Sequence, residues 1–161
     1  MATKSFRGMM QKDQVDTIPL STKTGTTGYR ITKLQVMPVD IGGNVNTSNE
    51  TSIQIYSIES SAAAQAALTH QNIDFSDNTL LGVGYFTRDQ GVVAVNSETI
   101  IFDNTKFNQD VYVVYKDSQT NTIGMNYYIE MEQMPLSLDE NTVATLKDIR
   151  NIKSQWVNNI I

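Results

Sequence analysis

The stretch that decides the fold runs from Asn108 to Gln133 and reads as two strands joined by a polar turn. Its arms are Asp110-Val-Tyr-Val-Val-Tyr-Lys116 and Met125-Asn-Tyr-Tyr-Ile-Glu-Met-Glu-Gln133. In the second arm apolar side chains alternate with polar ones, which is typical of an antiparallel strand with one face in water. Residues 117–124 between the arms are rich in turn-forming types, so the stretch predicts a β-hairpin.

Similar patterns recur upstream and extend the hairpin into a larger β structure. Strands are predicted at 27–37, 51–59, 80–87 and 98–103, with a weaker candidate at 91–95. Within the third of these, Gly82 and Gly84 indicate a bulge or a close approach of another backbone. The sequence therefore predicts a mainly β protein, an antiparallel β-sandwich of about six to eight strands in a jelly-roll-like arrangement.

Beyond the second arm the sequence period changes from two to about 3.6 residues. Ser137-Leu-Asp-Glu140 is a capping-box pattern, which places carboxylates at the positive end of a helix. An apolar stripe follows at helical spacing, so we expect an amphipathic helix over residues 139–157, packed on the sandwich. The apolar character continues to the chain end, and we expect Trp156, Ile160 and Ile161 to contact a neighbouring subunit.

The amino-terminal residues 1–27 differ from the rest, and we interpret them as an arm or extended segment ahead of a domain spanning 28–161. Residues 1–10 show no clear helical or strand period. Two interpretations are open for them: a disordered tail, or an arm that gains order only by burial on a neighbouring subunit. The contact residues of such an arm would be Phe6, Arg7, Met9 and Met10.

Composition narrows the possible functions. A chain of 161 residues without cysteine fits one domain and excludes disulfides and thiolate metal sites. The net charge of −5 argues against nonspecific nucleic-acid binding, although residues 1–35 carry +4 and the remainder carries −9. The sequence has no apolar signal core and no window long enough to span a bilayer. We therefore expect synthesis in a cytoplasm, with no membrane contact and no direct nucleic-acid contact.

No residue pattern predicts a catalytic, cofactor-binding or metal-binding site, and an enzyme is the least favoured class. His70 is the only histidine, and zinc sites need several nitrogen or sulfur ligands. Glu130 and Glu132 share one strand face and could form an acid pair, but a solvated sheet face explains them as well. Tyrosines on the 108–133 stretch suit an interface, and cross-strand packing is the alternative explanation. A stacking platform for single-stranded nucleic acid or sugar is a third, but it would want basic residues interleaved with the rings, and Asp110, Glu130 and Glu132 are acidic. The candidate contact residues among the tyrosines are Tyr112 and Tyr128.

Several segments carry a family resemblance. The carboxy-terminal third contains Ile100-Ile-Phe-Asp-Asn, Met125-Asn-Tyr-Tyr-Ile-Glu-Met-Glu-Gln and Asn141-Thr-Val-Ala-Thr-Leu-Lys-Asp-Ile-Arg-Asn. These segments resemble a family of small, mostly uncharacterised virion structural proteins of tailed phages, many of them marine. Gly28-Tyr-Arg-Ile-Thr-Lys-Leu-Gln-Val-Met-Pro38 is similar to the first strand of that family. The resemblance covers most of the chain beyond residue 27 and implies a virion component without chemistry.

The resemblance implies a non-enzymatic phage capsid decoration or cement protein, located in the virion after synthesis in the host cytoplasm. Such a protein would bind the major capsid protein or other virion proteins and stabilise the shell, and we expect a homo-oligomer. Two alternatives are open. One is a host glycan-binding or receptor-binding module at a vertex or tail, and the other is a head–tail neck or adaptor subunit.

Overall fold

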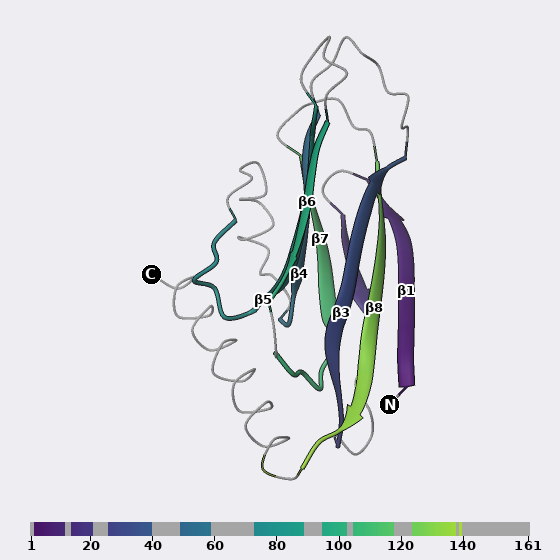
Figure 1. Ribbon diagram of the computed structural model, residues 1–161, viewed down its shortest axis with the longest axis vertical. Helices are drawn as coiled ribbons and strands as arrows, with labels where there is room; N and C mark the ends of the chain where they lie inside the picture. The colour runs from purple at the N-terminus through teal and green to yellow at the C-terminus, as the bar shows by residue number, and fades with distance from the viewer. Residues whose placement is uncertain are drawn as a thin grey trace.

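The computed structural model describes residues 2–11, 14–20, 26–39, 49–58, 73–88, 95–102, 105–117, 124–137 and 139. Over these residues the chain forms two antiparallel sheets that pack as a sandwich (Figure 1). The strands are β1 (Ala2–Met10), β2 (Val15–Ile18), β3 (Thr27–Pro38), β4 (Asn49–Tyr56), β5 (Leu80–Arg88), β6 (Val95–Ile101), β7 (Val111–Asp117) and β8 (Met125–Pro135).

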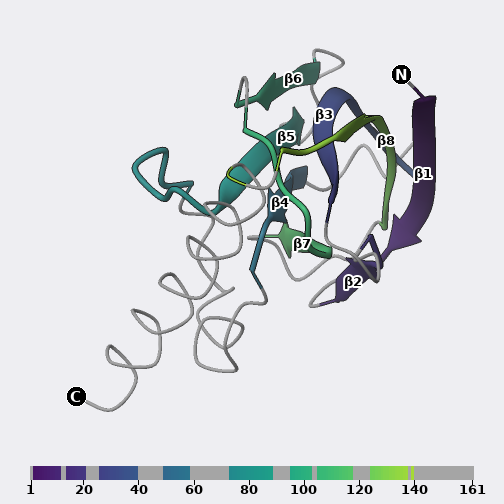
Figure 2. The same ribbon diagram turned by 90° about the horizontal axis from the view of Figure 1, so that it is seen from below.

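One sheet has three strands in the order β1-β8-β3, and the other has five in the order β2-β7-β4-β5-β6. The view from below shows these two layers facing each other (Figure 2). The predicted mainly β antiparallel sandwich is thus confirmed. Of the predicted helix over 139–157, only Asp139 belongs to the described residues.

The predicted hairpin between the two arms of 108–133 is wrong. Strand β7 pairs with β2 and β4, whereas β8 pairs with β1 and β3, so the two arms lie in opposite sheets. The apolar face of β8 packs inward, as its alternation predicted. Alternation reports which side chains are buried and not which strand is the neighbour. A connection of this length can also cross the roughly 10 Å between packed sheets.

The expectation that residues 1–10 gain order only on a partner is also wrong. Strand β1 pairs with β8 along its whole length, from Ala2 opposite Gln133 to Met10 opposite Met125. Its inward positions are occupied by Lys4, Phe6, Gly8 and Met10. Because one of these is charged and another has no side chain, the period of two is not visible in the sequence.

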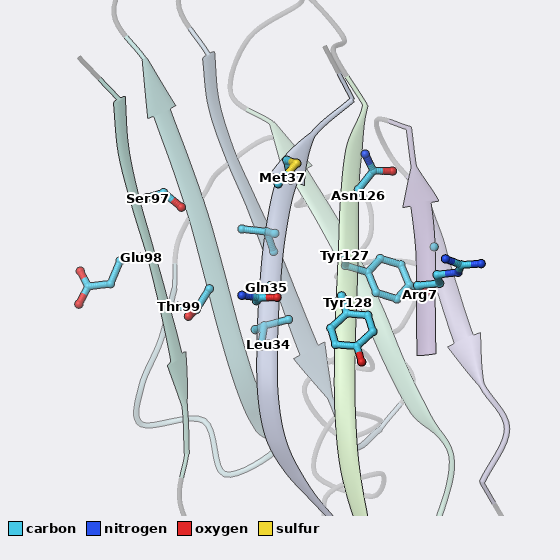
Figure 3. Close-up of a pocket in the computed structure, with 12 residues that line it drawn as sticks. Arg7, Leu34, Gln35, Met37, Ser97, Glu98, Thr99, Asn126, Tyr127 and Tyr128 are labelled. Atoms are coloured by element: carbon cyan, nitrogen blue, oxygen red, sulfur yellow. The ribbon is translucent and has the colours of Figure 1, made fainter. Parts of the chain in front are cut away.

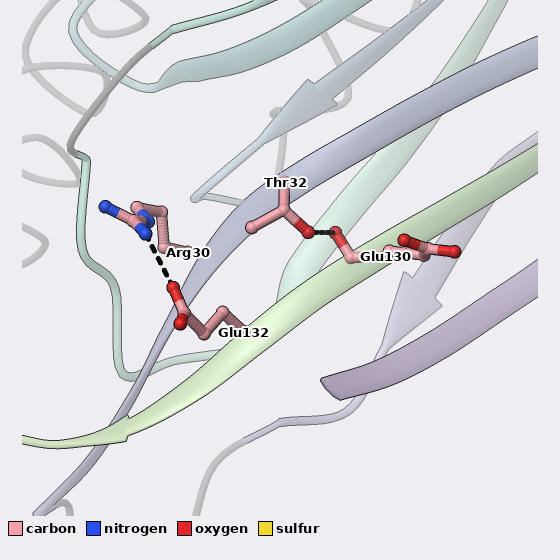
Figure 4. A network of polar contacts seen from close by, with 4 residues as sticks. All are labelled: Arg30, Thr32, Glu130 and Glu132. Atoms are coloured by element: carbon pink, nitrogen blue, oxygen red, sulfur yellow. Dashed lines mark hydrogen bonds and ion pairs between the residues drawn. The ribbon is translucent and has the colours of Figure 1, made fainter. Parts of the chain in front are cut away.

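A β-bulge in β3 explains why this strand also lacks a simple alternation. Tyr29 and Ile31 are buried before the bulge and Leu34 after it, with the shift in pairing between Ile31 and Lys33. The extra residue, Thr32, donates a hydrogen bond from Oγ1 to the carbonyl oxygen of Glu130, at 3.2 Å (Figure 4). The bulge keeps the apolar face of β3 toward the core on both sides of the shift.

The two glycines of β5 let β3 approach the five-stranded sheet closely. A Cβ atom at Gly84 would lie 2.9 Å from Val36 Cγ1, and one at Gly82 would lie 3.7 Å from Leu34 Cδ2. The close approach is made by two side chains of β3 and not by another backbone, while the pairing of β5 with β4 shifts register between Ile55, opposite Gly82, and Tyr56, opposite Leu80. The fully buried centre between the sheets includes Ile53, Ile55, Val111, Val113, Tyr115, Ile129 and Met131.

Tyr127 links the two sheets by a polar contact inside the sandwich. Its ring covers Gly8 on the neighbouring strand, where a Cβ atom would lie 2.7 Å from the phenol oxygen. That oxygen donates a hydrogen bond to Asp16 Oδ2 of β2 in the opposite sheet, at 3.0 Å. Burial, followed by the negative charge of Asp16 and this hydrogen bond, raises the pKa of Tyr127 well above its usual range.

Two adjacent methionines of β1 test whether this strand belongs to the folded subunit. Met10 is 0% exposed and Met9 is 49% exposed. Met10→Ala is expected to lower the free energy of unfolding by about 2–5 kcal/mol, because it leaves a cavity in the core. Met9→Ala, the matched control, should stay within about 0.5 kcal/mol of the parent. Chemical denaturation measures both, and equal effects would contradict the placement of β1.

The raised pKa of Tyr127 predicts that the folded protein is less stable at alkaline pH. The folded phenol keeps its proton above pH 10, where an unfolded tyrosine loses it, so the folded state binds more protons. The free energy of unfolding should therefore fall as the pH rises through about 10. Tyr127→Phe should lose stability at neutral pH but show a shallower alkaline decline. Denaturation from about pH 8 to about pH 11 compares the slopes, and identical slopes would refute the prediction.

Candidate functional site

The outer face of the three-stranded sheet is the candidate site. Strand pairing places side chains from β1, β8 and β3 in transverse rows on this face. One row holds Met9, Asn126 and Met37, and the next holds Arg7, Tyr128 and Gln35. The remaining rows are Ser5, Glu130 and Lys33, followed by Thr3, Glu132 and Arg30.

The charges on this face come from both ends of the sequence. Acidic β8 lies between two basic strands, so cations of the amino-terminal region meet carboxylates of the carboxy-terminal region. Arg30 Nη2 and Glu132 Oε2 form an ion pair at 2.6 Å (Figure 4). Both side chains retain solvent access, at 38% and 20% exposure, so the pair aligns β3 with β8 more than it stabilises the fold.

A groove of about 750 Å³ crosses the upper rows of this face and reaches strand β6 (Figure 3). Arg7, Asn126, Tyr128 and Gln35 contribute to it from the three-stranded sheet. Ser97, Glu98 and Thr99 contribute from β6, which lies beside β3 across the open side of the sandwich. Leu34, Val36 and Met37 also line it, together with Tyr127 and Tyr128, so the lining mixes apolar and polar groups and contains one guanidinium group.

Tyr128 is fixed in position by the row next to it. Its hydroxyl donates a hydrogen bond to Glu130 Oε1 at 2.8 Å, and this bond is the main reason that the pKa of Tyr128 is raised. Lys33 Nζ lies 5.8 Å from the ring centroid, in cation–π geometry. The ring is therefore anchored at its hydroxyl end and by a cation, while the residue stays partly exposed.

Arg7 differs from the other cations of this face. Within the part of the chain that the structure describes, its guanidinium group forms no ion pair, whereas Arg30 is paired with Glu132. The side chain is exposed and lies at one end of the groove (Figure 3). An exposed guanidinium group without a carboxylate partner is available to bind an anionic group from outside the chain.

An apolar cluster borders the groove. Met9, Met37 and Val39 are 49%, 55% and 48% exposed. The Val39 amide donates a hydrogen bond to the Gly124 carbonyl oxygen at 2.9 Å, and a Cβ atom on Gly124 would lie 3.2 Å from the Met9 sulfur. These contacts place the exposed apolar side chains around the start of β8.

The predicted contact residues occupy different environments. Arg7, Met9 and Tyr128 share the outer face of the three-stranded sheet. Phe6 points inward and packs on the core, and fully buried Met10 is a core residue, so neither offers an exposed contact surface. Tyr112 is half-buried on the outer side of β7, in the other sheet. The remaining predicted contacts, Trp156, Ile160 and Ile161, lie outside the described residues.

Sequence reasoning missed Gln35, Met37, Asn126 and the β6 residues of the groove. Alternation placed Asn126 on the polar face of its strand, but only strand order brings it beside Met37. His70 lies outside the described residues. Among those that are described, no three histidine or carboxylate side chains gather as metal ligands, and no helix is long and apolar enough to cross a membrane. Glu130 and Glu132 accept bonds from Tyr128 and Arg30.

Comparisons with protein-family models, curated proteins and solved structures find no match to this chain.

Proposed function

We propose that this chain is a non-enzymatic structural protein of a phage virion, most specifically a capsid decoration or cement protein. It binds the major capsid protein or another virion protein, stabilises the shell, and is made in the host cytoplasm. The observation that carries the proposal is the group of exposed apolar side chains of Met9, Met37 and Val39 around the start of strand β8. Exposed apolar side chains that gather on one part of a polar surface are typical of protein–protein contact surfaces.

Strand β1 adds a second element to this contact surface. It is the last strand of its sheet, and within the described residues its outer edge pairs with no further strand. An edge strand can extend its sheet by pairing with a strand of another chain. Lys4 on β1 favours an acidic segment as the partner strand. The same edge could support a homo-oligomer, as we expected from the sequence.

Two finer features of the fold belong to this proposal. The jelly-roll-like arrangement would provide a rigid support for the contact face, and the amphipathic helix over 139–157 would pack on the sandwich. The segment from Trp156 to Ile161 would then reach a neighbouring subunit. Glu130 and Glu132 have structural partners on β8 and β3, and the proposal assigns them no chemistry.

The groove favours one of the alternatives, a host glycan-binding module at a vertex or tail, because its lining combines an aromatic ring with amide groups. Copy number in purified virions separates the assignments. A decoration protein repeats over the whole capsid lattice, whereas a neck or adaptor subunit forms one small closed ring. We expect lattice-scale copy number, and the stoichiometry of a single ring would refute the decoration assignment.

The apolar cluster is tested by exchanging its side chains for polar ones of similar shape. A Met9→Gln, Val39→Thr variant should bind capsid shells at least about tenfold more weakly, because apolar area is no longer buried on binding. The matched Met9→Leu, Val39→Ile variant keeps apolar area and should bind as the parent does. Co-sedimentation with shells measures both, with thermal unfolding as the check on folding. Undiminished binding of the polar variant would contradict the proposed contact surface.

A further inference from the structure

We infer that the groove on the outer face of the three-stranded sheet binds an acidic saccharide. In this arrangement the Arg7 guanidinium group binds a sugar carboxylate, and the Tyr128 ring packs against a sugar ring. This inference rests on the glycan-binding alternative and is independent of capsid attachment. It names a ligand class and the side chains that distinguish it.

The charge argument comes from Arg7. Its planar guanidinium group can bind a carboxylate through two parallel hydrogen bonds, and no ion pair engages it among the described residues. The other cations beside it have roles within the sheet, since Arg30 pairs with Glu132 and Lys33 lies over Tyr128. The groove therefore offers one available cation at one end, which suits a ligand with a discrete negative charge.

The saccharide argument comes from the residues that follow Arg7 along the groove. Strand register places Tyr128 next to Arg7 and Gln35 next to Tyr128, with Asn126 one row away. Each amide side chain can both donate and accept hydrogen bonds, as sugar hydroxyl groups do. An anchored tyrosine ring gives the C–H face of a sugar an apolar surface, with little conformational entropy to lose.

The volume and charge of the groove argue against other ligands. About 750 Å³ lies within the usual range of small-molecule sites. A nucleic-acid strand needs several cations along its backbone, whereas Glu98 and Glu130 lie along or beside this groove. An acidic protein segment would also bind Arg7, but it makes no specific use of a tyrosine ring flanked by amides.

The probe is a short galacturonate oligosaccharide that keeps one free carboxylate and is methyl-esterified on its other rings, called oligogalacturonate below. Its full methyl ester is the matched neutral ligand with the same sugar rings. Titration calorimetry on the full chain should detect oligogalacturonate binding that weakens as salt is added. Binding of the methyl ester should be at least about tenfold weaker, because the charge-assisted bonds to Arg7 are lost. Equal binding of the two ligands, or no binding of oligogalacturonate, would overturn the inference.

Variants separate the site from general electrostatics. Arg7→Gln and Tyr128→Ala should each weaken oligogalacturonate binding about tenfold or more. Lys106→Gln removes one charge from an exposed residue that does not line the groove and should leave binding unchanged. An equal loss of binding in the Lys106→Gln variant would show that the net charge of the protein causes the effect, and would contradict the proposed site. Oligoglutamate tests the competing ligand class. If it binds with the same affinity as oligogalacturonate, and its binding depends on Arg7 but not on Tyr128, the ligand is an acidic polypeptide and the saccharide inference is refuted.

The Met9→Gln, Val39→Thr variant distinguishes failure of this inference from failure of the decoration proposal. Met9 and Val39 do not line the groove, so the Met9→Gln, Val39→Thr variant should bind oligogalacturonate as the parent does. Loss of saccharide binding in Arg7→Gln with unchanged attachment to shells would support two separate surfaces. If the Met9→Gln, Val39→Thr variant also lost the saccharide while remaining folded, the groove assignment would be wrong.

Discussion

The inward row of β8, Met125, Tyr127, Ile129 and Met131, is the contact on which the rest of the structure depends. Strand β8 is the middle strand of its sheet, so this row must be covered by the facing sheet, and all four side chains are buried. Burial of each such side chain contributes roughly 1.5–3 kcal/mol. Separation of β7 from β8 follows from the same requirement, because each strand then presents its apolar side chains to the interior of the sandwich.

Once β8 faces inward, its polar side chains must face outward, and the neighbouring strands complement them. Lys33 and Arg30 of β3 lie opposite Glu130 and Glu132, so opposite charges from distant parts of the sequence meet on one sheet. The bulge at Thr32 keeps β3 in register with this arrangement while Leu34 still points into the core. Charge pairing and core packing therefore select the same strand order.

The candidate site is a consequence of that order. A three-stranded sheet opposite a five-stranded one has one narrow, accessible outer face, on which the anchored Tyr128 ring lies between Arg7 and Gln35. The exposed apolar cluster borders the same face without sharing Arg7 or Tyr128. A protein contact centred on Met9 and Val39 and a small-ligand contact centred on Arg7 and Tyr128 can therefore coexist on one sheet, because neither of the first two side chains lines the groove.

Local sequence by itself determined that the chain is mainly β, which residues of β8 are buried, and that the glycines of β5 permit a close approach. These features depend on the alternation of side chains and on the lack of a Cβ atom, both of which can be read along a single strand. Strand pairing, the order of β1 as an edge strand, and the groove were decided only by the tertiary structure. Pairing joins segments far apart in sequence, as Arg30 and Glu132 show, and no local pattern specifies which edge meets which.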